Sequence, residues 1–347
     1  MIRVLIVDDS PFIRVALRKV MEGDPEIDIV GEAGNGREAI RLTERLKPDV
    51  ITLDINMPIM DGLTALGEIV RVCPDCGVLM VSALTTEGAR ETIDALNRGA
   101  VDFITKPSDI QELFKFRDEI IAKVKAVYNS KRVPRSEATF IPREPGSSIE
   151  TQTFSRVPLI AIGISTGGPQ TLSYVLSRLP TNFPSPVVVA IHMPDTFTST
   201  FAKHLDSVSP LPVAEAKEGE VIENGRVYVS KGRIHMTITG NSERSKVKYI
   251  QDDSYIYKPS ADLLFESVAK VFGKDSIGIV MTGMGNDGSR GICQIKKVGG
   301  VTIAEDPSTA VLWAMPENAI KTGMVDHVVS KEKLPDLLME LLRNVPV

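Results

Sequence analysis

A serine stands at the end of an apolar, strand-like run in the stretch IGISTGG, residues 162–168. Gly163, Ser165 and Gly167 match G-x-S-x-G, a pattern in which small neighbours expose a serine hydroxyl on a tight strand-to-helix turn. A Walker loop would require a lysine that this stretch lacks, and the dinucleotide fingerprint would require glycine at position 165. The pattern therefore favours a nucleophilic serine over a phosphate-binding loop.

A serine hydroxyl needs a general base to become a nucleophile, and a base needs a group that orients it. His192 directly follows the apolar run PVVVAI, so it projects from a strand end as Ser165 does. Asp287 lies in a glycine-rich turn after another such run, IGIVMTG. The remaining histidines are more typical of surface or packing positions: His204, His235 and His327. Ser165, His192 and Asp287 therefore predict Ser-His-Asp catalysis.

Acidic residues form a second candidate site near the N-terminus. Asp8 and Asp9 follow one strand-like run, Asp54 ends another, and Ser82 and Lys106 close two more. The carboxyl ends of parallel strands meet at one edge of a sheet, so these side chains are expected to converge. Close carboxylates require a hard cation such as Mg²⁺, and a lysine and a hydroxyl suit phosphoryl oxygens. We expect a magnesium-dependent phosphoryl site there.

Alternating patterns of strands and helices position both sets of residues. In the first part of the chain, strands are predicted at 3–7, 28–33, 50–54, 77–83 and 101–106. In the second part, strands are predicted at 158–164, 186–191, 226–230, 277–281 and 300–304. Helical patterns lie between many of these runs, which predicts two α/β domains with doubly wound, mostly parallel sheets. The segment 211–260 has short strand-like pieces and turns, which predict an inserted hairpin region.

The chain of 347 residues is long for a single hydrophobic core, so two domains are expected. Between residues 128 and 155 the apolar periodicity ends, and proline, serine, threonine and mixed charges dominate. Such a composition cannot bury enough apolar surface to fold. We therefore expect a first domain at 1–127, a flexible linker at 128–155 and a second domain at 156–347.

Composition restricts the compartment and the partners. The net charge of −5 gives no overall attraction to nucleic acid, and no apolar run is long enough to span a bilayer. The N-terminus lacks the pattern of a signal peptide, and three cysteines do not make a disulfide framework. We expect a cytoplasmic protein without membrane insertion, in which Cys73 and Cys76 lie in a surface turn and form no metal or redox site.

The first 120 residues resemble a two-component response-regulator receiver, through the motifs VDDSPF, LDINMP, MDG, SAL and the pair Lys106-Pro107. The resemblance implies a flavodoxin-like domain of five parallel strands in which a histidine kinase phosphorylates Asp54. It implies these Mg²⁺ ligands: Asp8, Asp9, Asp54 and the backbone carbonyl of Asn56. It also implies that the phosphate is sensed by Ser82, Lys106 and the aromatic side chain of Phe103, which changes rotamer.

The motifs IGISTGGP, HMPDTFT, KPSAD and MTGMGNDG resemble the catalytic domain of chemotaxis protein-glutamate methylesterases, which also carry an N-terminal receiver. The resemblance implies a phosphorylation-activated hydrolase that removes methyl groups from glutamyl γ-methyl esters on the cytoplasmic helices of chemoreceptors and releases methanol. Deamidation of receptor glutamines is implied as a second activity, and hydrolysis needs no cofactor. Ser165 would attack the ester carbonyl, and His192 would accept its proton and pass it to the leaving group. Asp287 would orient the imidazole of His192. The backbone N–H groups of Thr166 and Met284 would bind the oxyanion.

Two alternative functions remain for the second domain, both without hydrolase activity. Non-catalytic nucleotide binding is opposed by the missing lysine and the obstructed glycine fingerprint. A DNA-binding output is opposed by equal numbers of basic and acidic side chains in 154–347 and by the absence of a helix-turn-helix pattern. Three residues depart from the family pattern, namely Ile164, Ile191 and Ala314, so the sequence leaves the substrate pocket undefined in detail.

Overall fold

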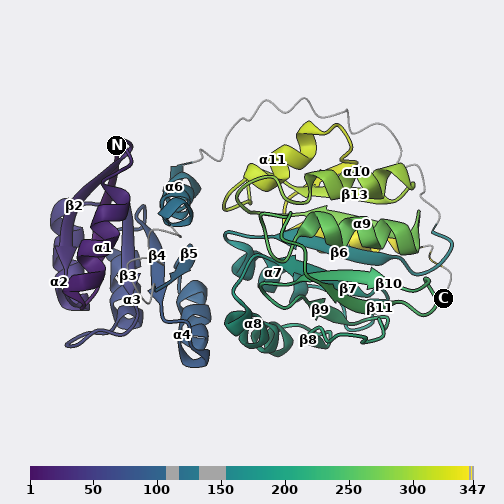
Figure 1. Ribbon diagram of the computed structural model, residues 1–347, viewed down its shortest axis with the longest axis horizontal. Coiled ribbons are helices and arrows are strands. Elements are labelled where there is room, and N and C mark those ends of the chain that lie inside the picture. The colour runs from purple at the N-terminus through teal and green to yellow at the C-terminus, as the bar shows by residue number, and fades with distance from the viewer. Residues whose placement is uncertain (107–116, 133–153, 344, 346–347) are drawn as a thin grey trace. The chain divides into compact units, whose positions relative to one another are not determined.

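The computed structural model describes residues 1–106, 117–132, 154–343 and 345. The chain divides into two compact units, Met1–Val133 and Pro134–Val347, and each has its own parallel sheet (Figure 1). None of the described helices has the length and apolar character that crossing a membrane requires.

The sheet of the first unit has five strands in the order β2-β1-β3-β4-β5, and every neighbouring pair is parallel. Its strands are β1 (Ile2–Val7), β2 (Ile27–Ala33), β3 (Val50–Asp54), β4 (Gly77–Ser82) and β5 (Asp102–Thr105). The predicted strands agree with these bounds to within about a residue. The buried apolar runs were sufficient to locate them because both faces of a parallel sheet are covered by helices.

The described helices of the first unit are α1 (Pro11–Met21), α2 (Gly36–Leu46), α3 (Gly62–Val72), α4 (Thr86–Asn97) and α6 (Arg117–Arg132). The first four begin in the same way, because a polar side chain before the helix accepts an N–H of its first turn. These N-cap residues are Ser10, Asn35, Asp61 and Thr85. The caps fix where each helix starts after the strand that precedes it.

Helix α6 corrects the predicted start of the linker, because residues 128–132 belong to this helix. Val124 and Val127 are fully buried, and the Ser130 hydroxyl donates to the Val127 carbonyl over 2.7 Å. Packing of this apolar stripe extends the helix into a polar sequence that has no apolar period of its own. The rest of the predicted linker, up to residue 153, lies outside the described residues.

The turn at Cys73–Cys76 differs in one respect from the prediction. The Cys76 N–H donates to the Cys73 carbonyl over 3.0 Å, so the segment is a turn. The Cys76 side chain, however, is only 3% exposed, because the residue leads directly into β4. Cys76 is therefore a small core residue rather than a surface residue.

The second unit has a sheet of seven parallel strands in the order β14-β13-β12-β6-β7-β9-β8. Its strands are β6 (Leu159–Ile164), β7 (Val187–Ile191), β8 (Val213–Glu215), β9 (Val227–Val229), β12 (Ser276–Val280), β13 (Val301–Glu305) and β14 (His327–Val329). The sequence did not predict β8 and β14, which have three residues each and too little apolar length to be recognised. The predicted doubly wound α/β class is confirmed.

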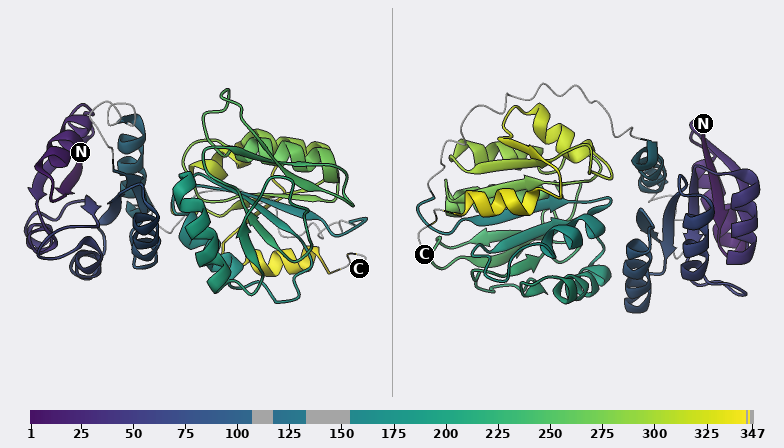
Figure 2. Two further views of the ribbon diagram at one scale, coloured as in Figure 1. Left: turned by 60° about the horizontal axis from the view of Figure 1, so that its bottom comes forward. Right: turned by 180° about the vertical axis from the view of Figure 1, so that it is seen from behind.

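Helices cover both faces of this sheet, as Figure 2 shows. They are α7 (Gly168–Leu176), α8 (Asp195–Val208), α9 (Ala261–Phe272), α10 (Ser289–Lys297), α11 (Ala314–Lys321) and α12 (Leu334–Leu341). Within the predicted hairpin region 211–260, only β10 (His235–Thr239) and β11 (Lys246–Ile250) form an antiparallel pair. Strands β8 and β9 instead join the edge of the main sheet, which narrows the insertion to β10 and β11.

Each sheet has a point where the chain reverses its direction of winding. In the second unit the chain leaves β6 toward β7 and leaves β12 toward β13, although β6 and β12 are neighbours. In the first unit the same reversal lies between β1 and β3. Loops diverge at such points and leave room for a ligand beyond the carboxyl ends of the strands. Both candidate sites follow these strands.

The close approach of α9 to β6 requires glycine at position 163. A Cβ atom added there would lie 2.6 Å from the Cβ of Ala261 and 3.3 Å from a ring atom of Phe265. We expect Gly163→Ala to destabilise the second unit by about 1–3 kcal/mol, because the helix must move outward. Urea unfolding followed by the fluorescence of Trp313, which lies in this unit, measures the effect.

Gly67, in helix α3, offers a matched control, since a Cβ atom added there would have no neighbouring atom within 4 Å. Gly67→Ala should leave the Trp313 transition unchanged and stabilise the first unit by up to about 1 kcal/mol. An unaltered Trp313 transition in Gly163→Ala would contradict the predicted contact.

Candidate active site

Ser165 occupies the turn between β6 and α7. Its N–H donates to the Thr282 carbonyl over 2.9 Å, and its carbonyl accepts the Gly168 N–H over 2.7 Å. Gly167 has a φ of 72°, and a Cβ atom there would lie 2.4 Å from the Cβ of Val311. Glycine is therefore required for the chain to turn immediately after the serine. The result is a half-buried serine on a rigid backbone at the edge of the sheet.

His192 follows β7, the strand beside β6, and its Nε2 lies 2.9 Å from Oδ2 of Asp287. A carboxylate only accepts, so Nε2 carries the proton and Nδ1 is left as the basic nitrogen. The ring of Tyr257 stacks on the imidazole at a centroid distance of 4.8 Å and an interplanar angle of 4°. The sequence did not predict a role for Tyr257, because no residue near it in the chain indicates that its ring stacks on His192.

Asp287 is 4% exposed and accepts several hydrogen bonds besides that of His192. Its Oδ1 accepts from the Ser260 hydroxyl over 2.9 Å, from the Asp262 N–H over 3.0 Å and from the Gly288 N–H over 3.1 Å. Its Oδ2 accepts from the Ala261 N–H over 2.7 Å. These donors include the first N–H groups of α9, which favour a negative charge at the helix N-terminus.

The protonation state of Asp287 follows from these contacts. Burial acts to raise the pKa of this carboxyl, but the hydrogen bond and charge of His192 and the N–H groups of α9 outweigh it and lower the pKa. Asp287 therefore remains a carboxylate that can stabilise a protonated His192 during a reaction.

The structure brings the three predicted catalytic residues to neighbouring strand ends. Ser165 follows β6, which pairs on one side with the strand that His192 follows and on the other with β12, the strand before Asp287. No hydrogen bond joins Ser165 to His192 among the described residues. Such contacts are often long without substrate and shorten in the reacting complex.

Thr166 and Met284, the predicted oxyanion donors, lie on loops that Thr282 helps to hold. The Thr282 hydroxyl donates to the Thr166 carbonyl over 2.8 Å and accepts the Leu312 N–H over 2.9 Å. Asn318 donates to the Gly285 carbonyl, next to Met284, over 3.0 Å. Among the described residues, the N–H groups of Thr166 and Met284 donate to no acceptor, so neither is committed to another partner.

A buried acid that sequence reasoning missed supports this loop. Glu305, at the end of β13, is 2% exposed and accepts the Thr282 N–H over 2.8 Å and the Thr309 hydroxyl over 3.0 Å. Burial raises the pKa of Glu305 to about 7. A glutamate that ends a strand carries no sequence signal for this contact, because Thr282 lies in the turn after a different strand, β12.

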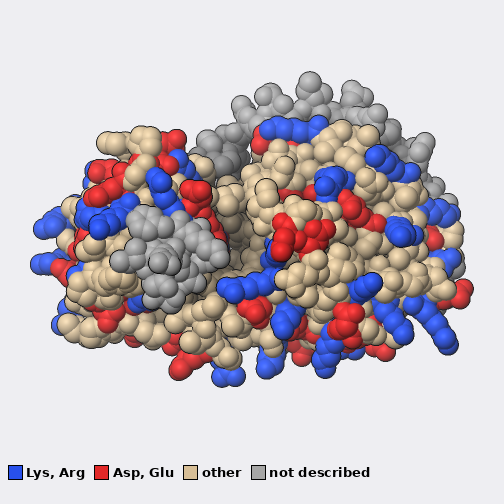
Figure 3. All heavy atoms as spheres, viewed as in Figure 1, with Lys and Arg blue, Asp and Glu red and all other residues tan. Residues whose placement is uncertain are grey.

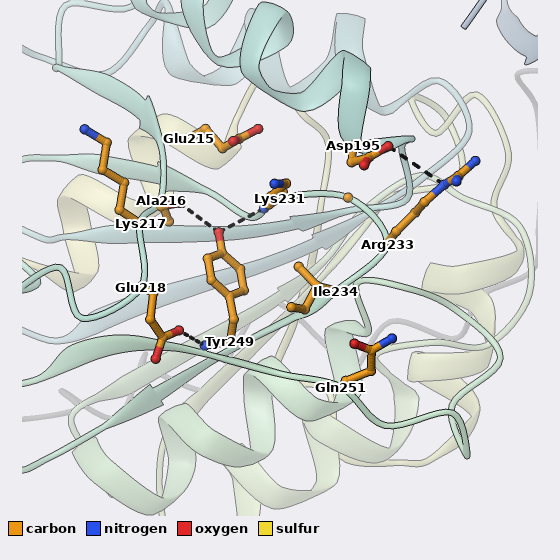
Figure 4. Close-up of a pocket in the computed structure, with 11 residues that line it drawn as sticks. Asp195, Glu215, Ala216, Lys217, Glu218, Lys231, Arg233, Ile234, Tyr249 and Gln251 are labelled. Atoms are coloured by element: carbon orange, nitrogen blue, oxygen red, sulfur yellow. Dashed lines mark hydrogen bonds and ion pairs between the residues drawn. The ribbon is translucent and has the colours of Figure 1, made fainter.

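A pocket of about 620 Å³ lies beside the segment that follows His192 (Figure 4). Its wall includes Asp195, at the start of α8, whose carboxylate lies 3.8 Å from Nε of Arg233. The Tyr249 hydroxyl, also in the wall, accepts the Lys231 N–H over 3.1 Å. The described residues that line this pocket do not include Ser165, His192 or Asp287, so it is separate from the candidate active site.

The acidic residues of the first unit also converge. Ligand atoms of Asp8, Asp9 and Asp54 lie within 4.8 Å of one another. Lys106 Nζ lies 3.0 Å from Oδ2 of Asp8 and 2.9 Å from Oδ2 of Asp54. Burial and then the charge of Asp8 raise the pKa of Asp54 to about 6, against the opposing effect of Lys106. This donor set of oxygens fits a hard divalent cation, which would offset the repulsion.

The other residues predicted to act at this site have different contacts. The Ser82 hydroxyl donates to the Gly88 carbonyl over 3.1 Å, and the Asn56 side chain donates to Glu91 over 3.1 Å. The Phe103 ring is 4% exposed and lies 5.2 Å from Lys123 Nζ. Ser82 would therefore have to exchange its partner to contact a phosphoryl group on Asp54.

Comparison with known proteins shows which protein families the chain is similar to. The model of the CheB methylesterase family matches residues 160–338, and that of the response regulator receiver domain matches residues 4–117. The protein-glutamate methylesterase/protein-glutamine glutaminase of Pyrococcus abyssi is 42% identical over 99% of this chain and 94% of its own. The homologue from Thermotoga maritima is 40% identical over 98% of each chain. The crystal structure of the Thermotoga maritima CheB catalytic domain covers 53% of this chain and 98% of its own, with 37% identity and a TM-score of 0.52.

The raised pKa of Glu305 predicts a dependence of stability on pH. Between about pH 4.5 and 7 the folded protein holds this proton and the unfolded chain does not, so wild-type stability falls as pH rises through that window. Glu305→Gln keeps an acceptor for Thr282 but cannot ionise. The variant should gain up to about 3 kcal/mol over wild type between pH 4.5 and 7. Urea unfolding at several pH values measures the difference.

The exposed Glu243 supplies the control, because Glu243→Gln should leave the pH dependence of stability unchanged. A constant difference between Glu305→Gln and wild type from pH 4.5 to 8 would contradict the assignment of this titration to Glu305.

Proposed function

The chain belongs to the family of CheB methylesterases with a response-regulator receiver domain, and we propose that Ser165, His192 and Asp287 perform its ester hydrolysis. The protein is an enzyme, a protein-glutamate methylesterase, and its relatives are also named as protein-glutamine glutaminases. The observation that carries the residue assignment is the 2.9 Å hydrogen bond between His192 and the buried Asp287, at the strand next to the one that Ser165 follows.

In this mechanism the Ser165 hydroxyl attacks the ester carbonyl while Nδ1 of His192 takes its proton. Asp287 holds Nε2–H and stabilises the imidazolium. The N–H groups of Thr166 and Met284 bind the oxyanion of the tetrahedral intermediate. Collapse of that intermediate expels the methoxide group, which takes the proton from Nδ1 and leaves as methanol.

The acyl-enzyme is then hydrolysed by the reverse use of the same groups. A water molecule gives a proton to His192 and attacks the acyl carbonyl, and the released Ser165 oxygen takes that proton back. The product is a free glutamate side chain. A glutamine side chain would lose ammonia in place of methanol and give the same acyl-enzyme, which accounts for a second activity at one site.

A methylesterase of this family acts on a protein, and a receiver takes its phosphoryl group from a kinase. We assign the substrate and the phosphodonor from the sequence motifs. The substrate would be methylated helices of chemoreceptors, and the phosphodonor would be the chemotaxis histidine kinase. Asp54 would be the phosphoacceptor. Mg²⁺ held by Asp8, Asp9, Asp54 and the Asn56 carbonyl would offset the charge of the incoming phosphoryl group, with Lys106 beside it.

Nucleotide binding and DNA binding, the two alternative functions of the second unit, are less favoured. Nucleotide binding at the loop 163–168 conflicts with the serine at position 165, which would obstruct a pyrophosphate. For DNA binding, a continuous basic surface would be needed. On the face in Figure 3, basic side chains of the described residues are interspersed with acidic ones.

Ser165→Ala should lower methanol release from a methylated receptor fragment by about 1,000-fold or more, because the nucleophile is lost. His192→Ala should have a similar effect, and the double variant should be little worse than either single one, since the residues act as a unit. Ser177→Ala, on an exposed serine just after α7, is the control and should retain full activity. Retention of more than about a tenth of the activity by Ser165→Ala would exclude it as the nucleophile.

Asp54→Ala should retain basal methanol release but lose the increase produced by a small phosphodonor with Mg²⁺. A coupling of about 1–3 kcal/mol predicts an increase of roughly 5–150-fold in wild type. Asp75→Ala, an exposed carboxylate between α3 and β4, should keep the full increase. A phosphodonor response in Asp54→Ala equal to that of wild type would refute the assignment of the phosphoacceptor.

A further inference from the structure

His235, the first residue of β10, is fully buried, and both of its ring nitrogens are bonded. Nδ1 lies 3.1 Å from the backbone nitrogen of Ser260, and Nε2 lies 3.0 Å from the Asp252 carbonyl oxygen. A backbone N–H can only donate and a carbonyl can only accept. The contacts therefore select one neutral tautomer, in which Nε2 carries the proton and Nδ1 accepts.

Ser260 connects this histidine to the catalytic carboxylate. Its hydroxyl donates to Oδ1 of Asp287 over 2.9 Å, and it is the N-cap residue of α9. The next two residues, Ala261 and Asp262, donate their backbone N–H groups to the same carboxylate. The position of Ser260 thus determines the position of three consecutive donors to Asp287.

A second contact shows that β10 holds α9 along its length. The Ile238 N–H of β10 donates to the Ser267 hydroxyl of α9 over 2.9 Å. The hairpin is therefore attached to the helix at Ser260 and again two turns later. Only the first attachment, made by His235, reaches a residue that bonds to Asp287.

We propose that His235 is a positioning residue for ester hydrolysis, whose Nδ1 holds Ser260 so that the start of α9 keeps Asp287 aligned with His192. The proposal rests on the function proposed above. Without an acceptor at Nδ1, the buried Ser260 N–H would have no partner, and the helix start would shift to find one. A shift of Asp287 would turn the imidazole of His192 away from the orientation in which its Nδ1 accepts the Ser165 proton.

Two amide variants of similar size separate the roles of the two ring nitrogens. His235→Asn places a carbonyl oxygen near the position of Nδ1, whereas the longer side chain in His235→Gln places its amide near Nε2. We expect His235→Asn to remain within about 3-fold of wild type in kcat for methanol release. We expect His235→Gln to lose about 10–100-fold in kcat, by analogy with the loss of hydrogen-bond partners of metal ligands, with KM nearly unchanged.

His204, a half-buried histidine on α8, provides the control, because His204→Gln should keep wild-type kcat. Equal kcat values for His235→Asn and His235→Gln would overturn the proposal, and so would an equal loss in His204→Gln. Thermal unfolding of each variant identifies any loss caused by unfolding. If wild type itself releases no methanol, the proposed function fails instead, so the two failures are distinguishable.

A measurement on the wild-type protein needs no variant to fold. The ¹⁵N chemical shifts of selectively labelled histidines report which ring nitrogen is protonated. At the pH of full activity, His235 should carry its proton on Nε2, with Nδ1 unprotonated. A protonated Nδ1 on His235 in the active enzyme would overturn the proposal.

Discussion

The arrangement of the candidate active site depends on the hydrogen bonds that the buried carboxylate of Asp287 accepts. A charge this far from water is stable only when hydrogen bonds replace its hydration. The protein supplies them from the start of α9, from the Ser260 hydroxyl and from His192. These donors come from two segments far apart in the chain, residues 260–262 and His192, and the carboxylate itself lies in the turn after β12. Satisfying one carboxylate therefore also fixes the helix, this turn and the imidazole relative to one another.

The two sheets differ in strand number and order but share a reversal of winding, and the electrostatics at the two reversal points differ. Each unit places its candidate site residues at the carboxyl edge of a parallel sheet, where the winding reverses. In the first unit, carboxylates lie close together and burial raises the pKa of Asp54. In the second, donors surround a single carboxylate and lower its pKa. One edge therefore suits a divalent cation and a phosphoryl group, and the other suits proton transfer through a histidine.

Around Ser165, the proposed nucleophile, the backbone is held by contacts between loops more than by any single helix or strand. Thr282 bonds to the backbone of both Ser165 and Thr166, and Glu305 in turn holds the Thr282 N–H. The glycines at 163 and 167 allow the neighbouring helix and loop to approach so closely. An oxyanion site built from backbone N–H groups requires this rigidity, because donors that must reorient during the reaction contribute less.

The sequence by itself determined the strands that are long and apolar, the α/β class and the residues at the strand ends, including Ser165, His192, Asp287 and Asp54. These features are local, since each depends on a run of neighbours with a recognisable period or turn. Only the tertiary structure decided that α6 runs through residue 132, that β8 joins the edge of the main sheet, and that His235 and Glu305 are buried beside the site. Their partners lie far away in the chain, as Ser260 and Thr282 do, and no local pattern of residues encodes a contact between segments that meet only after folding.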